Sequence, residues 1–208
     1  FDGGGKTASF SANLGAAPTE NSYLNITVES KYHGFSNRGL PDQRVYNPAS
    51  PGYSAANNAA ESQIKGYPNL NLISGDAEYR MHVLAFNGGV ELPGDFEVYS
   101  FGTYGHKDAS AYENYRLPNR LPAIYPKGFS PMLETLETDY ALTGGIKGQG
   151  PGSWRYDLSS TYGRDDHEVR VRKSANLQLY ADTGATPTEF HAGDDGGKQE
   201  ILADIADR

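Results

Sequence analysis

Residues 134–167 decide the fold, and they read ETLETDYALTGGIKGQGPGSWRYDLSSTYGRDDH. Polar and apolar side chains alternate in two segments of this stretch, on either side of a glycine-rich connection at 148–152. Successive side chains of a β-strand point to opposite faces, so each segment has one apolar and one polar face. The connection contains glycine and proline, which tight turns favour. We therefore predict a β-hairpin, and either protein or lipid must cover its apolar face.

The same alternation recurs along most of the chain. We predict strands at 6–16, 23–35, 75–90, 96–107, 134–147 and 154–167, an extended piece at 175–180, and either a strand or a short amphipathic helix at 198–208. The connections between the main strands alternate in length: they are short at 17–22, 93–95 and 148–152, and long at 36–73, 108–133 and 168–197. In an up-and-down antiparallel sheet, every second connection lies at the same end. All long loops then share one end and all tight turns the other, as in outer-membrane β-barrels. The sequence therefore predicts an all-β fold, an antiparallel up-and-down transmembrane β-barrel segment of six to seven strands.

Composition limits the classes of function. The chain has 208 residues, 25 of them Gly and 15 Tyr, with no Cys and a formal charge of −8. The negative charge argues against nucleic acid as a partner, and the absence of Cys excludes disulfides and thiol catalysis. No apolar run is long enough for a transmembrane helix. Transmembrane strands need no such run, because their lumen-facing residues keep the overall hydropathy low.

Ionisable residues form no convincing catalytic or metal-binding group. The densest cluster is 165–168, Asp-Asp-His-Glu, which we interpret as the solvated end of a strand. We interpret 194–197 as a turn, because it lacks the further ligand spacing of a calcium loop. Gly5-Lys6-Thr7 matches the end of a phosphate-binding loop, but strand-like alternation follows it where a helix is required. We therefore expect no catalytic residue, no metal and no cofactor, and not an enzyme.

The long loops hold the better candidates for ligand binding. Tyr and Arg supply rigid contact area and directional hydrogen bonds, and both residue types occur in the first two long loops. The candidates are Arg38, Asp42, Arg44 and Tyr46 in the first loop, and Tyr112, Tyr115, Arg116 and Arg120 in the second. Either an anionic chelate or a sugar fits such a set. The alternative is that these side chains only pack the loops.

Several segments, taken together, resemble the barrel of TonB-dependent outer-membrane receptors. They are Asn21–Thr27 (NSYLNIT), Thr103–Asp108 (TYGHKD), Tyr125–Pro131 (YPKGFSP), Thr143–Gly148 with Trp154–Ser159 (TGGIKG and WRYDLS), and Thr186–Phe190 (TPTEF). The resemblance covers nearly the whole chain. It implies a 22-stranded barrel in the outer membrane of a Gram-negative cell, filled by a separate N-terminal plug domain. Such a receptor binds a scarce nutrient, for example a siderophore or a carbohydrate, and imports it with energy from the TonB complex.

The chain is too short for that whole architecture, so we expect a partial barrel without the plug and without the TonB-contacting segment. The expected partners are the plug of the same full-length protein, the TonB complex, the nutrient and outer-membrane lipid. Asp139, Lys147, Arg155 and Asp157 would line the wall against the plug. Two alternatives remain open at this point: a segment of a passive porin, and a soluble β-sandwich that recognises carbohydrate with its Tyr-rich loops.

Overall fold

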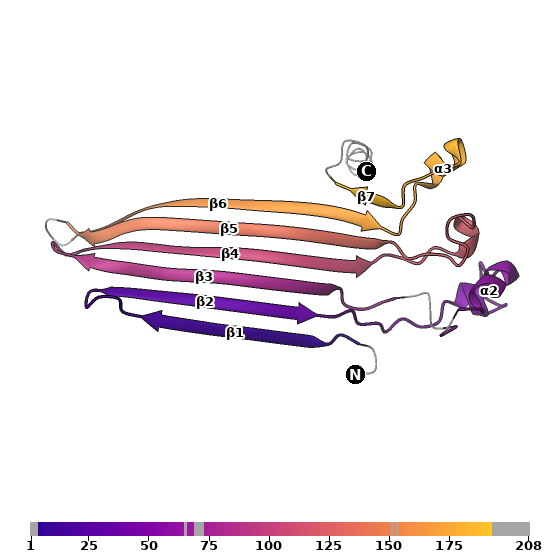
Figure 1. Ribbon diagram of the computed structural model, residues 1–208, viewed down its shortest axis with the longest axis horizontal. Helices are drawn as coiled ribbons and strands as arrows, with labels where there is room; N and C mark the ends of the chain where they lie inside the picture. The colour runs from indigo at the N-terminus through magenta and orange to yellow at the C-terminus, as the bar shows by residue number, and fades with distance from the viewer. Residues whose placement is uncertain (1–3, 65, 69–72, 151, 153, 193–208) are drawn as a thin grey trace.

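The computed structural model describes residues 4–64, 66–68, 73–150, 152 and 154–192. These residues form one seven-stranded antiparallel sheet whose spatial order follows the chain. The strands are β1 (Thr7–Ala16), β2 (Ser22–His33), β3 (Glu78–Leu92), β4 (Phe96–Tyr112), β5 (Met132–Gln149), β6 (Arg155–Arg172) and the short β7 (Glu189–His191). Figure 1 shows the tight turns at one end of the sheet and the long connections at the other. The predicted all-β class, the up-and-down order and the sorting of the connections are confirmed.

Strand ends near the long connections differ from the prediction. Strand β4 continues to Tyr112, β5 begins at Met132 and β6 continues to Arg172, so parts of the predicted loops 108–133 and 168–197 belong to strands. The pairing between neighbouring strands explains this extension, because Tyr112 of β4 pairs with Met132 of β5, and Met132 pairs with Arg172 of β6. The predicted loop 168–197 also contains β7, which pairs with the end of β6. The element predicted at 198–208 lies outside the described residues.

The extended piece predicted at 175–180 is wrong, because this segment forms helix α3 (Leu177–Thr183). The side chain of Asn176 accepts a hydrogen bond from the backbone N–H of Leu179, at 2.9 Å, and so caps the first turn. Gly184 ends the helix in the left-handed conformation, with φ +76°. These two terminal residues favour a helix over the apolar alternation that suggested a strand.

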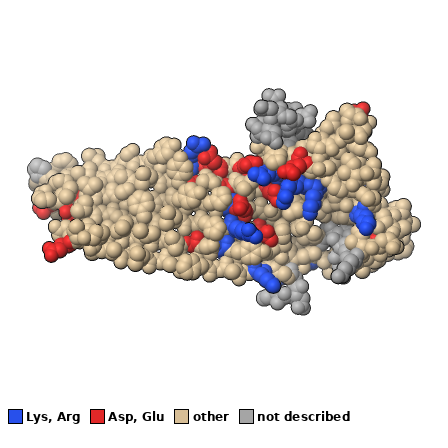
Figure 2. Space-filling model, viewed as in Figure 1, with Lys and Arg blue, Asp and Glu red and all other residues tan. Residues whose placement is uncertain are grey.

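One face of the sheet is apolar over the half that lies near the tight turns. Opposite residues of an antiparallel ladder share a face, so the register Leu14–Ile26–Phe86–Gly102–Leu142–Tyr162 runs across this face from β1 to β6. We call the apolar side chains of this surface, which are exposed or half-buried, the apolar band: Leu14, Ile26, Val28, Leu84, Phe86, Val90, Phe96, Val98, Tyr104, Tyr140, Leu142, Ile146, Tyr156, Leu158 and Tyr162. Figure 2 looks onto this face, where Lys, Arg, Asp and Glu gather over the half near the long connections.

The opposite, polar face carries charged side chains along its whole length. Near the turns, Lys147 Nζ lies 3.0 Å from Glu97 Oε2, and the Tyr23 hydroxyl donates to Glu97 over 3.0 Å. The Tyr99 hydroxyl donates to Asp157 over 2.6 Å in the same region. Nearer the long connections, Lys107 and Glu137 form an ion pair. The two faces of this sheet are therefore built for different surroundings.

Buried apolar side chains lie at the end with the long connections. Val45, Tyr115, Leu121, Phe129 and Met132 are the buried hydrophobic residues of the described chain. In contrast, Leu158 of the apolar band is 67% exposed and Leu142 is 50% exposed. The described sheet is therefore a single layer with no second sheet packed on its apolar band.

Short helices lie within the long connections. Helices α1 (Gln43–Tyr46) and α2 (Ala55–Glu61) follow β2, and the 3-10 helix η1 (Pro118–Arg120) lies between β4 and β5. This corrects the loop composition that the sequence indicated for 36–73. No helix in the described part of the chain is both long and apolar enough to span a membrane.

Candidate ligand-binding site

Asp42 organises the first long connection. Its side chain caps α1 by accepting from the backbone N–H of Arg44 at 3.0 Å, and it pairs with the Arg44 guanidinium, whose Nη2 lies 2.6 Å from Oδ2. Asp42 is 6% exposed. The hydrogen bonds from Arg44 hold the pKa of the Asp42 carboxyl below its usual value, and the same contact raises the pKa of Arg44. This pair is therefore ionised and holds the connection in shape.

Asp42→Ala is expected to lower the stability of this connection by about 1 kcal/mol, because it removes an N-cap acceptor together with the ion pair. Asp42→Asn is the matched control, since its amide oxygen can still cap the helix while the charge is lost. Amide hydrogen exchange at Val45 and Tyr46 measures the difference. Equal loss of protection in both variants would assign the effect to the charge and not to the cap.

Glu61 and Tyr115 join the first two long connections in the buried centre of this end. Glu61, the last residue of α2, has no exposed surface, and its Oε1 lies 2.5 Å from the Tyr115 hydroxyl. The same hydroxyl lies 2.9 Å from the main-chain oxygen of Lys127. Burial raises the pKa of the Glu61 carboxyl to about 7, and burial with the adjacent carboxyl raises the pKa of Tyr115. The carboxyl therefore gains or loses its proton near neutral pH.

Close packing around Tyr115 fixes the second long connection. Gly128 has φ +71°, and a Cβ there would lie 2.1 Å from the Tyr115 hydroxyl oxygen and 2.6 Å from the carbonyl oxygen of Arg116. Only glycine fits both the conformation and the space. The main chain of Arg116 forms two hydrogen bonds with Phe129, of 2.7 and 3.0 Å. The residues that carry the candidate side chains are thus held in an ordered loop.

The eight predicted residues fall into separate environments. Asp42 and Tyr115 belong to the buried centre, and the half-exposed Arg44 acts electrostatically on both Tyr115 and Glu61. Arg116 and Arg120 line one cavity of about 310 Å³ between the second and third long connections. The remaining three are Tyr46, which bonds to Gln43; Tyr112, whose ring packs at 4.8 Å on Phe35; and Arg38, whose backbone N–H donates to Ser74.

Sequence reasoning missed several residues at this end. Phe129 stacks on Tyr125, with 4.2 Å between ring centroids, and both belong to a segment singled out only for its resemblance to receptors. Lys127 and Lys173 line a second cavity of about 340 Å³, together with Tyr112 and Tyr125. Glu61 lies in a stretch that its composition indicated as loop. The local sequence feature that indicates a helix here is Ser54, a residue suited to cap a helix, which precedes the Ala-rich segment Ala55–Glu61.

At the turn end, a cavity of about 730 Å³ opens between the hairpins β3–β4 and β5–β6. Lys147, Arg155 and Asp157, which were predicted to line the wall, lie at its edge with Glu91, Asp95 and Glu97. Leu92, Phe96 and Tyr156 also line it, so this cavity combines charged and apolar side chains.

Within the described residues, no group of three or more His, Asp or Glu side chains is placed to hold a metal ion. In the 165–168 cluster, Asp166 pairs with Arg164 at 2.8 Å and Glu168 with Arg170 at 2.8 Å. The cluster lies within β6 and not at its end. The turn predicted at 194–197 lies outside the described residues.

Comparisons of the chain with protein-family models, with curated proteins and with solved structures gave no match.

Proposed function

We propose that this chain is part of the transmembrane barrel of an outer-membrane active-transport receptor of the TonB-dependent kind. Its long connections face outward and bind a scarce nutrient, and energy delivered by TonB drives import. The observation that carries this proposal is the exposed apolar band on a single-layer sheet whose other face is charged. Water is a poor partner for so much contiguous apolar surface, whereas lipid suits it.

The dimensions of the band support a lipid partner. In β4 it runs from Phe96 to Tyr104, about nine residues, and a tilted spanning strand needs about 9–11. Tyr104 and Tyr140 lie at its upper edge, which is the edge nearer the long connections. Phe96 and Tyr156 lie at its lower edge, nearer the tight turns. Aromatic side chains favour both interfaces of a bilayer. The tight turns would then face the periplasm.

The free edges of the sheet indicate that more strands are needed. Within the described residues β1 pairs only with β2, and β6 pairs with β7 over three residues. Unpaired backbone groups in lipid cost several kcal/mol each, so a sheet in a membrane must close on itself. We therefore propose that further strands of the same protein complete a barrel of about 22 strands, as the resemblance implies. A plug domain would fill it and contact the charged polar face.

Fractionation of native cells tests this function directly. The full-length protein is expected in the outer-membrane fraction, retained after alkaline washing and released only by detergent. Recovery with soluble periplasmic proteins would overturn the proposal. The coding sequence upstream of Phe1 gives a second test, because an active receptor requires a plug there and a passive porin does not.

A further inference from the structure

The cavity that Arg116 and Arg120 share combines positive charge with an apolar floor. Its volume is about 310 Å³, at the lower end of the range for small-molecule sites. Phe129, Pro131 and Leu177 supply apolar groups to the lining, and Ser174 lies beside them. The lining comes from both the second and the third long connection.

Both guanidinium groups are available to a ligand. The arginine salt bridges of the described residues involve Arg44, Arg164, Arg170 and Arg172, and none involves the two cavity arginines. Both side chains are exposed. Two unpaired cations at one cavity are an electrostatic arrangement that an anion would stabilise.

The walls of the cavity are held in place without a ligand. Phe129 is 9% exposed and stacks on Tyr125, whose hydroxyl donates to the carbonyl oxygen of Ser174 over 2.9 Å. This bond ties the second connection to the third. The backbone N–H of Asn119, next to Arg120, donates to the buried Asn57 side chain over 3.0 Å. A site formed in advance loses little entropy when it binds.

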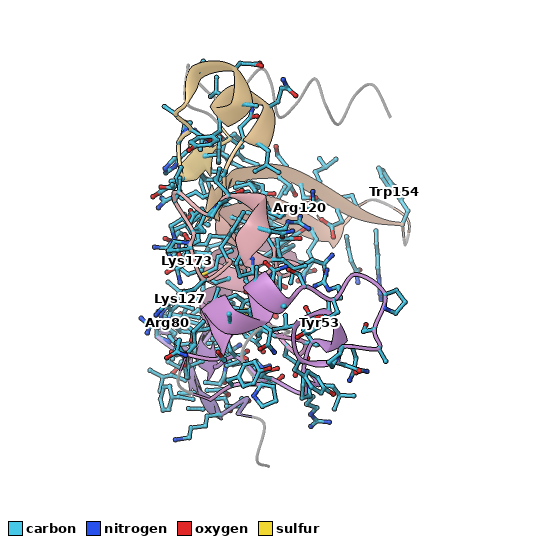
Figure 3. The ribbon with its side chains drawn as sticks, turned by 90° about the vertical axis from the view of Figure 1, so that its right-hand side faces the viewer. Tyr53, Arg80, Arg120, Lys127, Trp154 and Lys173 are labelled. Carbon is cyan, nitrogen blue, oxygen red and sulfur yellow. The ribbon has the colours of Figure 1, made fainter. Side chains whose placement is uncertain are left out.

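Arg120 lies toward the polar side of the sheet. In Figure 3, Arg120 lies away from Lys127, Lys173 and Arg80, which project together on the other side. Arg80 shares a face with the apolar band, because it pairs with Tyr32 and Asp108 in the register that also joins Leu84 to Tyr104. Arg120 is thus on the side that becomes the interior of a closed barrel.

We infer that the cavity binds an oxyanion, a carboxylate or phosphate group, whose attached ring or chain packs on Phe129 and Leu177. Arginine is suited to this, because its planar fork donates two parallel hydrogen bonds to such groups. This inference rests on the proposed function, and it means that the imported nutrient is an anionic small molecule with an apolar or planar part. A neutral sugar would leave both cations without a partner.

Isothermal titration calorimetry of phenyl phosphate with the detergent-solubilised full-length protein tests the inference. Benzoate tests the carboxylate form of the same chemistry, and phenol is the neutral analogue. We expect at least one anion to bind, phenol to bind at least tenfold more weakly, and Arg116→Gln with Arg120→Gln to weaken the anion at least tenfold. Lys127→Gln with Lys173→Gln is the matched control: it also removes two positive charges from the two connections that line the cavity and is expected to change Kd less than twofold.

Equal losses in the two double variants would overturn the inference, because they would assign binding to overall charge. Equal binding of phenol and the anions would also overturn it. Arg116→Lys with Arg120→Lys separates misfolding from loss of the fork, since it keeps the charge and is expected to bind with intermediate affinity. Fractionation decides the proposed function independently: an outer-membrane protein that binds neither anion keeps that function and loses this substrate class.

Discussion

Leu142→Arg is expected to destabilise the membrane-inserted protein by about 2 kcal/mol, because arginine on the lipid face costs about 2–4 kcal/mol at the middle of a bilayer and less toward its two surfaces. Leu142 lies within the apolar band, between Gly102 of β4 and Tyr162 of β6. It is half exposed in the single-layer sheet, so no protein neighbour shields the new charge. Denaturant unfolding of the full-length protein in phospholipid vesicles measures the change, and heat-modifiable gel mobility measures the assembled fraction.

Thr103→Arg provides the matched control for this substitution. Thr103 is exposed and pairs with Ala141, the residue before Leu142, so the two positions are neighbours on opposite faces. Arginine on the polar face would meet water or plug and is expected to change stability by less than 1 kcal/mol. If Thr103→Arg blocked assembly while Leu142→Arg did not, the apolar band would not be the lipid-facing side.

The loop cluster around Glu61 is expected to lose about 3 kcal/mol of local stability as the pH rises from about 4.5 to 7. The folded carboxyl has a pKa of about 7, above its ordinary value of 4.5, so the folded state holds the proton more tightly than the unfolded loop. The stabilisation is therefore complete below pH 4.5 and is lost as the pH rises to 7. Each pKa unit corresponds to about 1.4 kcal/mol.

Protection factors for the amides of Asn58 and Asn119, at pH 5 and pH 8, measure this effect. Glu61→Gln removes the titrating group and is expected to make the protection independent of pH. The other charged groups of the cluster do not titrate in this window: the pKa of Asp42 is lowered and those of Arg44 and Tyr115 are raised. Asp42→Asn is thus expected to keep the pH dependence. Equal protection at both pH values in the unsubstituted protein would contradict the expectation.

The sequence predicted the six main strands because alternation is a local property that follows directly from strand geometry. The extension of β6 escaped prediction because the charged run at 165–168 was interpreted as the solvated end of the strand. Alternation continues beyond this run, with Val169 and Val171 on one face and Arg170 and Arg172 on the other. The structure pairs Glu168 with Leu136 and Arg172 with Met132, so the strand continues through the charged run.

Arg116 and Arg120 could be predicted to lie near each other because they are close in the sequence, and both were predicted to bind a ligand. Their cavity was beyond the reach of sequence, because Ser174 and Leu177 come from another connection. The first connection escaped prediction for a similar reason. Helix α1 is four residues long, and the buried Val45 on it accepts a hydrogen bond at its carbonyl oxygen from the Asn58 side chain of α2. Such short helices depend on tertiary packing more than on local propensity.

The length of β6 has a consequence for how the protein meets its surroundings. From Arg164, which pairs with Tyr140 at the edge of the apolar band, to Arg172, the strand continues for about eight residues, roughly 27 Å of extended chain. In the proposed orientation these residues form a hydrated collar above the bilayer. Antibodies and other large particles would reach the collar and its rim first, while a solute would cross this vestibule before it met the membrane-embedded wall.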